Sequence, residues 1–152
     1  MIKLNFMIRI ITFMIVGVLI LQSCGKKDEV VPNVRFKVYI DLSQPQYSGN
    51  VFSVNTLVKD PISGVTMQAG ISGIIVYNVG ADRYNAFERY CPNDKDNKCK
   101  VSLAQDDSER SVCSCCKTEY LNMTGEVIEG ASKYGLKQYR ASREGNYLVI
   151  SN

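Results

Sequence analysis

The sequence contains no histidine, and this absence limits its chemistry more than any motif that is present. Histidine is the most frequent general acid or base in enzymes, and it activates the serine or cysteine nucleophile in most catalytic pairs. Paired catalytic carboxylates in a recognisable spacing and a phosphate-binding loop are missing as well. We therefore expect no enzyme activity from this chain on its own.

The first 23 residues have the features of an export signal. Lys3 and Arg9 give the segment a short positive start. Residues 10–21 then form an apolar run of 12 residues, which is shorter than the roughly 20 that a membrane-spanning helix needs. The run ends in Leu-Gln-Ser-Cys, which resembles the lipobox of bacterial lipoproteins. The resemblance predicts cleavage before Cys24, a lipid on the Cys24 thiol, and a place in the cell envelope on the periplasmic or surface side.

Removal of the signal, residues 1–23, leaves 129 residues, which is the size of one domain. We expect a lipidated tether over residues 24–33 and a β domain over residues 34–152. The alternative is an uncleaved N-terminal anchor with an incidental cysteine. The mature chain has 16 basic and 15 acidic residues, and this balance gives no basic surface for nucleic acid.

Five cysteines follow Cys24, and the expected compartment decides how they are interpreted. Disulfides form and persist outside the cytoplasm. Since five is an odd number, either one thiol is left over, or three cysteines bind a ligand beside one bridge. The five are Cys91, Cys99, Cys113, Cys115 and Cys116.

The mature chain has the pattern of a β protein. Residues 34–42 alternate strictly between apolar and polar side chains, which predicts a half-buried strand. Residues 74–89 and 100–113 each predict a hairpin, and residues 147–150 predict a closing strand. No stretch keeps a helical period for more than about two turns. Short strands separated by turns favour a small all-β sandwich or barrel.

Three segments in the second half follow an ordered pattern. Residues 91–93 read CPN, residues 113–120 read CSCCKTEY, and residues 124–131 read TGEVIEGA. In this order they resemble the Rieske domain family, whose loops carry C-x-H and C-x-x-H and are followed by a G-x-V-x-x-G-P-A turn. The match covers residues 73–152. It implies a Rieske-like β-sandwich or barrel with a cysteine-loop subdomain, which in the family holds a 2Fe-2S cluster.

Both ligand histidines of the family are replaced in this chain. Cys91 and Cys113 match the two cluster cysteines, while Asn93 and Cys116 stand where the histidines should be. Two imidazoles on one iron distinguish a Rieske centre from an all-thiolate cluster. Because the chain has no histidine, the resemblance implies a degenerate site in which an ordinary histidine-ligated cluster is excluded.

The same resemblance implies a disulfide between the two loops. Cys115 matches a second-loop cysteine that, in many Rieske proteins, is bridged to the first loop. Cys99 is its candidate partner, although it comes a few residues later than usual.

Three interpretations of the remaining site stay open. In the first, no metal is bound, Cys91 and Cys113 form a disulfide, and Cys116 has no disulfide partner. In the second, Cys91, Cys113 and Cys116 bind zinc, with Cys99 or Asn93 near the fourth position. In the third, an atypical iron–sulfur cluster persists on three or four thiolates.

These interpretations lead to two classes of function. The first is a non-catalytic, disulfide-stabilised module without a cofactor. The second is an electron-transfer protein with a mainly cysteine-ligated cluster, or the redox subunit of a larger enzyme; a zinc-binding variant is the remaining possibility. The expected partners are the lipid bilayer, through acylated Cys24, and an envelope protein or redox partner that the sequence does not identify.

Overall fold

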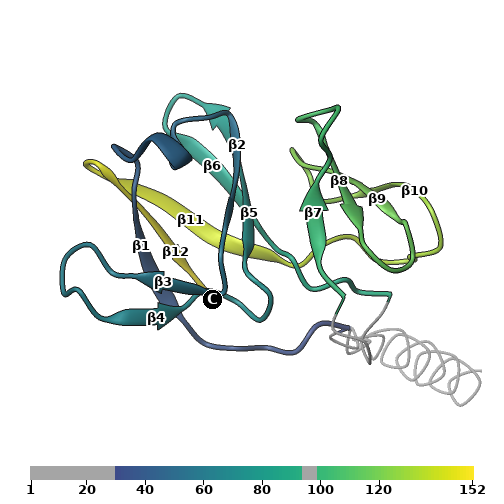
Figure 1. The fold of residues 1–152 in the computed structure, drawn as a ribbon, viewed down its shortest axis with the longest axis horizontal. Helices are drawn as coiled ribbons and strands as arrows, with labels where there is room; N and C mark the ends of the chain where they lie inside the picture. Colours follow the sequence, from purple (N-terminus) through teal and green to yellow (C-terminus); the bar gives the residue numbers. More distant parts are fainter. Residues whose placement is uncertain (1–29, 94–98) are drawn as a thin grey trace, which may run out of the picture.

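The computed structural model describes residues 30–93 and 99–152 (Figure 1). Their regular structure consists of strands and one short 3-10 helix, η2 (Pro45–Tyr47). The expected all-β class is therefore confirmed. The expected signal and Cys24 lie outside the described residues. Within the two described ranges, no helix is both long and apolar enough to cross a membrane.

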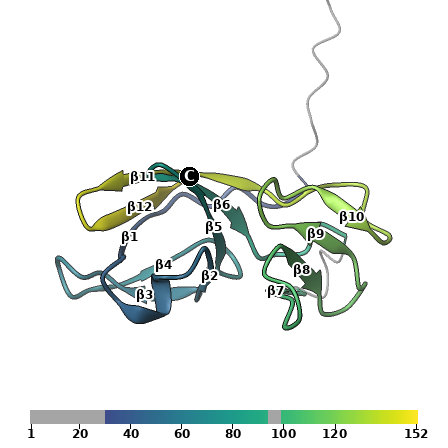
Figure 2. The same cartoon turned by 90° about the horizontal axis from the view of Figure 1, so that it is seen from above.

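The larger part of the fold is a curled six-stranded sheet (Figures 1 and 2). Its strand order is β1-β12-β11-β6-β5-β2, and all neighbouring strands are antiparallel. The strands are β1 (Lys37–Asp41), β2 (Val51–Val54), β5 (Ile74–Gly80), β6 (Arg83–Glu88), β11 (Gln138–Glu144) and β12 (Tyr147–Ser151). A separate hairpin of β3 (Leu57–Lys59) and β4 (Thr66–Gln68) lies beside this sheet.

A smaller four-stranded sheet carries the cysteine loops. Its order is β10-β9-β8-β7, and its strands are β7 (Val101–Leu103), β8 (Arg110–Cys113), β9 (Glu119–Leu121) and β10 (Val127–Glu129). The chain leaves the large sheet after β6 and returns to it in β11, which pairs with β6. The small sheet is therefore an insertion between two paired strands, and it is the expected cysteine-loop subdomain.

The first expected strand and both expected hairpins are present. In β1, Val38 and Ile40 are buried, as the alternating pattern predicts. The β5–β6 hairpin closes through Ala81 and Asp82, which have φ values of 50° and 60°. Such left-handed values at both turn residues match the right-handed twist of the two strands. The second expected hairpin is β7–β8, in which Val101 pairs with Cys113.

The β5–β6 hairpin separates two apolar cores. Ile74 and Val76 pack into the core of the large sheet, whereas Ile75 between them packs into the core of the cysteine-loop subdomain. Ala86 and Phe87 of β6 divide in the same way. Both faces of β5 are covered here, which explains why its sequence is a continuous apolar run rather than an alternating one.

Candidate functional site

The site is formed by two loops that are fixed by backbone hydrogen bonds. Cys113 ends β8 and pairs with Val101 of β7. On the other loop, the Cys91 amide donates to the Cys99 carbonyl over 2.9 Å. Each loop therefore presents a cysteine whose backbone position is set by a strand or by a hydrogen bond across its own loop.

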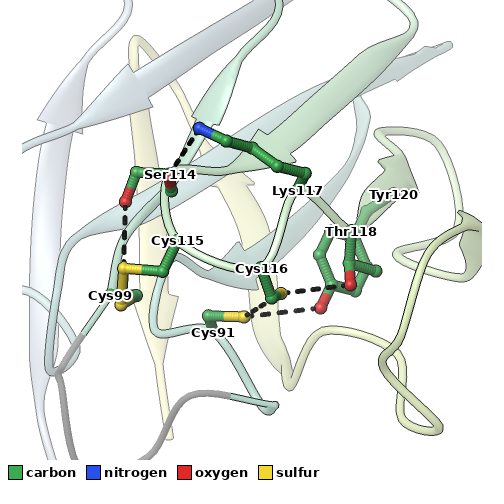
Figure 3. Close-up of a disulfide and its surroundings, with 8 residues drawn as sticks. All are labelled: Cys91, Cys99, Ser114, Cys115, Cys116, Lys117, Thr118 and Tyr120. Carbon is green, nitrogen blue, oxygen red and sulfur yellow. Dashed lines mark hydrogen bonds between the residues drawn. A yellow bond between two sulfur atoms is a disulfide. The ribbon is translucent and has the colours of Figure 1, made fainter.

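The second loop turns tightly between Cys113 and Thr118. The Cys113 amide donates to the Thr118 carbonyl (2.9 Å), and the Lys117 amide donates to the Cys113 carbonyl (3.2 Å). Lys117 has a φ of 59°, and its ammonium group donates to the Ser114 carbonyl over 2.7 Å. The turn brings the Cys116 side chain back toward the first loop, where its sulfur lies beside Cys91 (Figure 3).

A disulfide between Cys99 and Cys115 joins the two loops (Figure 3). The Cα atoms of the pair are 6.0 Å apart, and 16 positions separate the residues in sequence. This is the pair that the Rieske resemblance implied. It connects the start of β7 with the turn after β8, and so fixes the position of one loop relative to the other.

The three remaining cysteines of the subdomain come together beside this disulfide. The sulfur atoms of Cys91, Cys113 and Cys116 all lie within 4.8 Å of one another. The sulfur atoms of Cys91 and Cys116 are 3.6 Å apart. Cys91 and Cys113 are completely buried, and Cys116 is half-buried. We call this group the three-thiol cluster.

The Cys91–Cys113 bridge of the first interpretation is wrong for this structure, because both residues are thiols. A disulfide needs its sulfur atoms about 2.05 Å apart. The backbone of Cys113 is held in β8 and that of Cys91 by the Cys99 carbonyl. The thiols of Cys91 and Cys116 also share a hydrogen bond. Sequence spacing alone could not distinguish a bonded pair from a group of three thiols.

Two hydroxyl groups lie against the three-thiol cluster. The Thr118 Oγ1 atom is 3.1 Å from the Cys116 sulfur, and the buried Tyr120 hydroxyl is 3.7 Å from the Cys91 sulfur. Gly130 lets the returning chain pass close to Thr118, since a Cβ atom there would lie 2.6 Å from the Thr118 Cα. Gly130 belongs to the glycine-containing turn of the sequence analysis, so this turn is what packs against the second cysteine loop.

The surroundings separate the pKa values of the thiols. Burial raises the pKa of Cys113 to about 12, and the hydrogen bond with Cys91 adds to this. Burial also acts to raise the pKa of Cys116, but hydrogen bonds from the hydroxyl and amide of Thr118 outweigh it and lower the pKa. Burial raises the pKa of Tyr120. Cys116 therefore ionises at a lower pH than Cys113.

The residues at the site do not fit a histidine-ligated cluster of the Rieske type. A Rieske centre needs two imidazole ligands, and the chain has no histidine. An all-cysteine cluster needs four thiolates, but Cys99 is held in a disulfide, so the two loops offer three thiols. Asn93, at the position of the first histidine, is exposed. The residues that could hold a metal ion are Cys91, Cys113 and Cys116.

A buried carboxylate anchors the first cysteine loop, and it was not among the residues predicted from the sequence. Glu88, at the end of β6, is completely buried. Its oxygens accept four hydrogen bonds, from the amides of Ile71 (2.7 Å), Ser72 (2.8 Å) and Tyr90 (2.9 Å) and from the hydroxyl of Tyr139 (2.6 Å). An acidic residue directly after two apolar strand residues was the signal in the sequence. Because Tyr90 precedes Cys91, this carboxylate helps to set where the loop begins.

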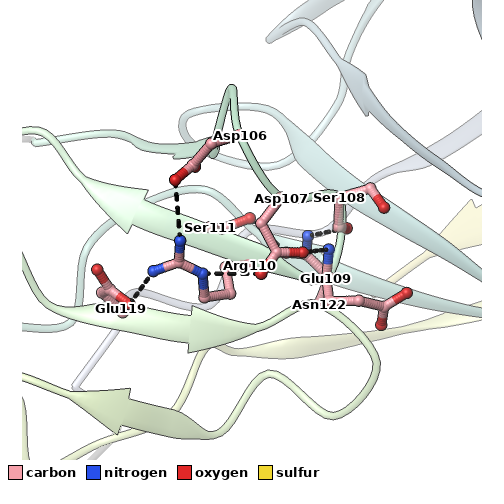
Figure 4. Close-up of polar contacts among 8 residues, drawn as sticks. All are labelled: Asp106, Asp107, Ser108, Glu109, Arg110, Ser111, Glu119 and Asn122. Atoms are coloured by element: carbon pink, nitrogen blue, oxygen red, sulfur yellow. Dashed lines mark hydrogen bonds and ion pairs between the residues drawn. The ribbon is translucent and has the colours of Figure 1, made fainter.

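Ion pairs between charged residues stabilise the hairpin that ends at Cys113 (Figure 4). Arg110 in β8 forms ion pairs with Asp106 (3.2 Å), Asp107 (2.9 Å) and Glu119 (2.6 Å). The hydrogen bond with Glu119, followed by that with Asp107, raises the pKa of Arg110. The network connects the β7–β8 turn with β9.

Comparisons with known proteins concern the fold. No protein-family model matches this sequence, and a search of curated protein sequences finds no match either. Among solved structures, the chain is similar to the cyanobacterial plasma membrane Rieske protein PetC3 from Synechocystis PCC 6803, with 21% identity and a TM-score of 0.49. The similarity covers 79% of this chain and 100% of that chain. In its own geometry this chain has the Rieske-like features: an all-β domain, an inserted cysteine-loop subdomain and a disulfide between the loops.

Proposed function

We propose that this protein is a lipid-anchored module of the cell envelope with a Rieske-like domain whose cluster site is degenerate, and that it has no enzyme activity of its own. One observation carries the proposal: three thiols and no imidazole meet where a Rieske centre needs two of each. The fourth nearby cysteine, Cys99, is engaged in the disulfide.

The fold has sources of stability that do not depend on a cofactor, which supports a structural or binding role. The Cys99–Cys115 disulfide clamps the two loops. The carboxylate of Glu88 satisfies buried backbone donors at the start of the first loop. The subdomain also has an apolar core of its own, which includes Phe87 and Tyr120. A domain of this kind can keep its shape after the loss of a cluster.

The proposed anchor would hold the domain close to a membrane. Val31 is buried, and the Lys137 ammonium donates to the Pro32 carbonyl (3.4 Å) and to Asn33 (3.1 Å), so the end of the expected tether contacts the domain from residue 31 onward. With the lipid on Cys24, about seven residues would connect them, and these reach at most about 24 Å. The partner that this arrangement favours is another envelope protein at the bilayer surface.

Elemental analysis and absorption spectroscopy of the purified full-length protein test the proposal. We expect iron far below one atom per chain and no visible iron–sulfur absorption, because the ligands of a Rieske centre are missing. Stoichiometric iron with sulfide would contradict the proposal and favour the electron-transfer alternative.

A second candidate function is thiolate-based zinc binding, favoured by the sulfur separations within the three-thiol cluster. Zinc in structural sites is almost always four-coordinate. With Cys99 unavailable, its fourth ligand would have to be Asn93 or water. The same elemental analysis distinguishes this candidate, since it predicts one zinc ion per chain.

A further inference from the structure

We propose that Cys91, Cys113 and Cys116 form a three-coordinate, all-sulfur site for a soft monovalent cation, and that this cation is Cu(I). The inference goes beyond the proposed function and shares with it the three-thiol cluster. It depends on the number, type and spacing of the sulfur atoms and on the groups that surround them.

The spacing suits three ligands around one ion. At a metal–thiolate distance of about 2.3 Å, an ion in the plane of three sulfur atoms would place them about 4 Å apart. The three sulfur atoms already lie within 4.8 Å of one another, and those of Cys91 and Cys116 are 3.6 Å apart. The trigonal spacing of about 4 Å therefore lies within the range of separations that the folded loops already hold.

The donor set selects a soft ion that accepts three ligands. Thiolates favour Cu(I), zinc and iron–sulfur clusters over hard cations. Zinc in structural sites is almost always four-coordinate, so it would need Asn93 or water as well, because the nearby Cys99 sulfur is used in the disulfide. The next groups are the hydroxyls of Thr118 and Tyr120, which are neutral oxygen donors placed to hydrogen-bond to sulfur. A three-coordinate Cu(I) ion needs none of these additional ligands.

The surroundings of the cluster favour a bound ion that is kept from water. Cys91 and Cys113 have no exposed surface, and they belong to the same apolar core as Ile75, Phe87 and Leu136. Cys116 is half-buried and gives access from the surface. The disulfide holds the two loops together before the ion arrives, so binding does not have to order them. Binding exchanges thiol protons for the ion, which enters and stays as Cu(I), and no electron is transferred.

The test measures Cu(I) affinity by competition with a coloured Cu(I) chelator under anaerobic conditions. The full-length chain carries Cys24→Ser throughout, so that position 24 offers no sulfur in any form, and alkylation mapping first establishes that all three cluster thiols are reduced. We expect one Cu(I) per chain. Loss of an outer-shell partner weakens metal binding about 10–100-fold. Each of C91S, C113S and C116S removes a direct ligand and should weaken Cu(I) binding by more than this. The control M123L, which removes an exposed sulfur at 41% exposure, should bind like the parent.

X-ray absorption of the Cu(I)-loaded parent protein keeps the inference testable if a serine variant fails to fold. We expect three sulfur neighbours around copper. No stoichiometric binding, a fourth ligand, two sulfur neighbours, or equal weakening by M123L would each overturn the inference. Failure to bind Cu(I) in a protein free of iron would remove this inference alone. A histidine-type cluster signal in the protein as isolated would remove the proposed function as well.

Discussion

The sulfur atom of Cys116 lies 3.6 Å from that of Cys91, although 25 positions separate the two residues in the chain. Cys116 stands at the position that the Rieske resemblance assigns to the second ligand histidine, and its sulfur lies beside that of Cys91 (Figure 3). At this position the chain offers a sulfur ligand, where the resemblance would place a nitrogen ligand. This contact brings the second cysteine loop to the first and completes the three-thiol cluster.

The double variant C99S/C115S should lower the free energy of unfolding by about 3 kcal/mol, because the disulfide closes a ring of about 17 residues in the unfolded chain. Urea unfolding of the parent and the variant measures the difference. The matched control is S114A, next to Cys115 on the exposed turn, which should stay within about 0.5 kcal/mol of the parent. Peptide mapping without reduction that found Cys115 joined to any residue other than Cys99 would refute the pairing.

E88Q should destabilise the fold by about 3 kcal/mol. The glutamine would place an NH₂ group, which is a donor, next to the backbone amides and the tyrosine hydroxyl that donate to the buried carboxylate. Y139F removes one of the four hydrogen bonds and should cost about half as much. Chemical denaturation measures both, and E129Q, on the exposed end of β10, is the surface control. An E88Q protein as stable as the parent would show that the carboxylate is not the anchor of the first loop.

Much of the fold could be predicted from the sequence, and the exceptions have physical causes. The alternation at Val38 and Ile40 predicted β1 because one face of that strand is buried. β11 was missed because six of its seven residues are exposed or half-buried and only Tyr139 is buried. Its place in the sheet comes from pairing with β12 and β6 and not from an apolar pattern.

The candidate site was predicted in part. The Rieske resemblance identified the cysteines that meet and implied the Cys99–Cys115 pair, which the structure contains. The proposed Cys91–Cys113 bridge failed because sequence spacing does not give sulfur separations. Glu88 was missed because a single acidic residue in a strand does not reveal that amides 16 and 17 positions earlier will donate to it. Such long-range contacts exist only once the chain has folded.

Alkylation should modify Cys116 before Cys113 in the native protein. Cys116 is half-buried and its pKa is lowered, so its reactive thiolate forms at lower pH than in the unfolded chain. Cys113 is buried, and its raised pKa keeps it a thiol until the pH approaches about 12. Timed alkylation followed by peptide mass spectrometry over a range of pH gives the order.

The same shift has a consequence for stability at high pH. The folded state holds the Cys113 proton more tightly than the unfolded state, so this contribution is fully present below the usual thiol pKa and is lost as the pH rises toward about 12.

The denatured protein is the control for the alkylation experiment, since its thiols should react at similar rates. Equal or faster modification of Cys113 in the native protein would contradict the arrangement of the three-thiol cluster.

C24S should accumulate as an uncleaved precursor, because the expected processing reaction needs a lipid on the Cys24 thiol. Intact-mass spectrometry of the protein from membranes should show the parent starting at a diacylated Cys24 and the variant starting at Met1. C116S is the matched cysteine control and should be processed normally. An unmodified Cys24 in the parent would remove the proposed lipid anchor.

The most direct test of the central claim is electron paramagnetic resonance of the full-length protein as isolated, after reduction with ascorbate and then with dithionite. The account predicts no iron–sulfur signal in either state, because Asn93 and Cys116 occupy the positions of the two histidines. The variant N93H/C116H, treated in parallel, should gain the ability to assemble a cluster if the loops have kept their geometry. A parent protein with the g-values of a histidine-ligated cluster and a potential well above the about −400 mV of all-cysteine clusters would contradict the account.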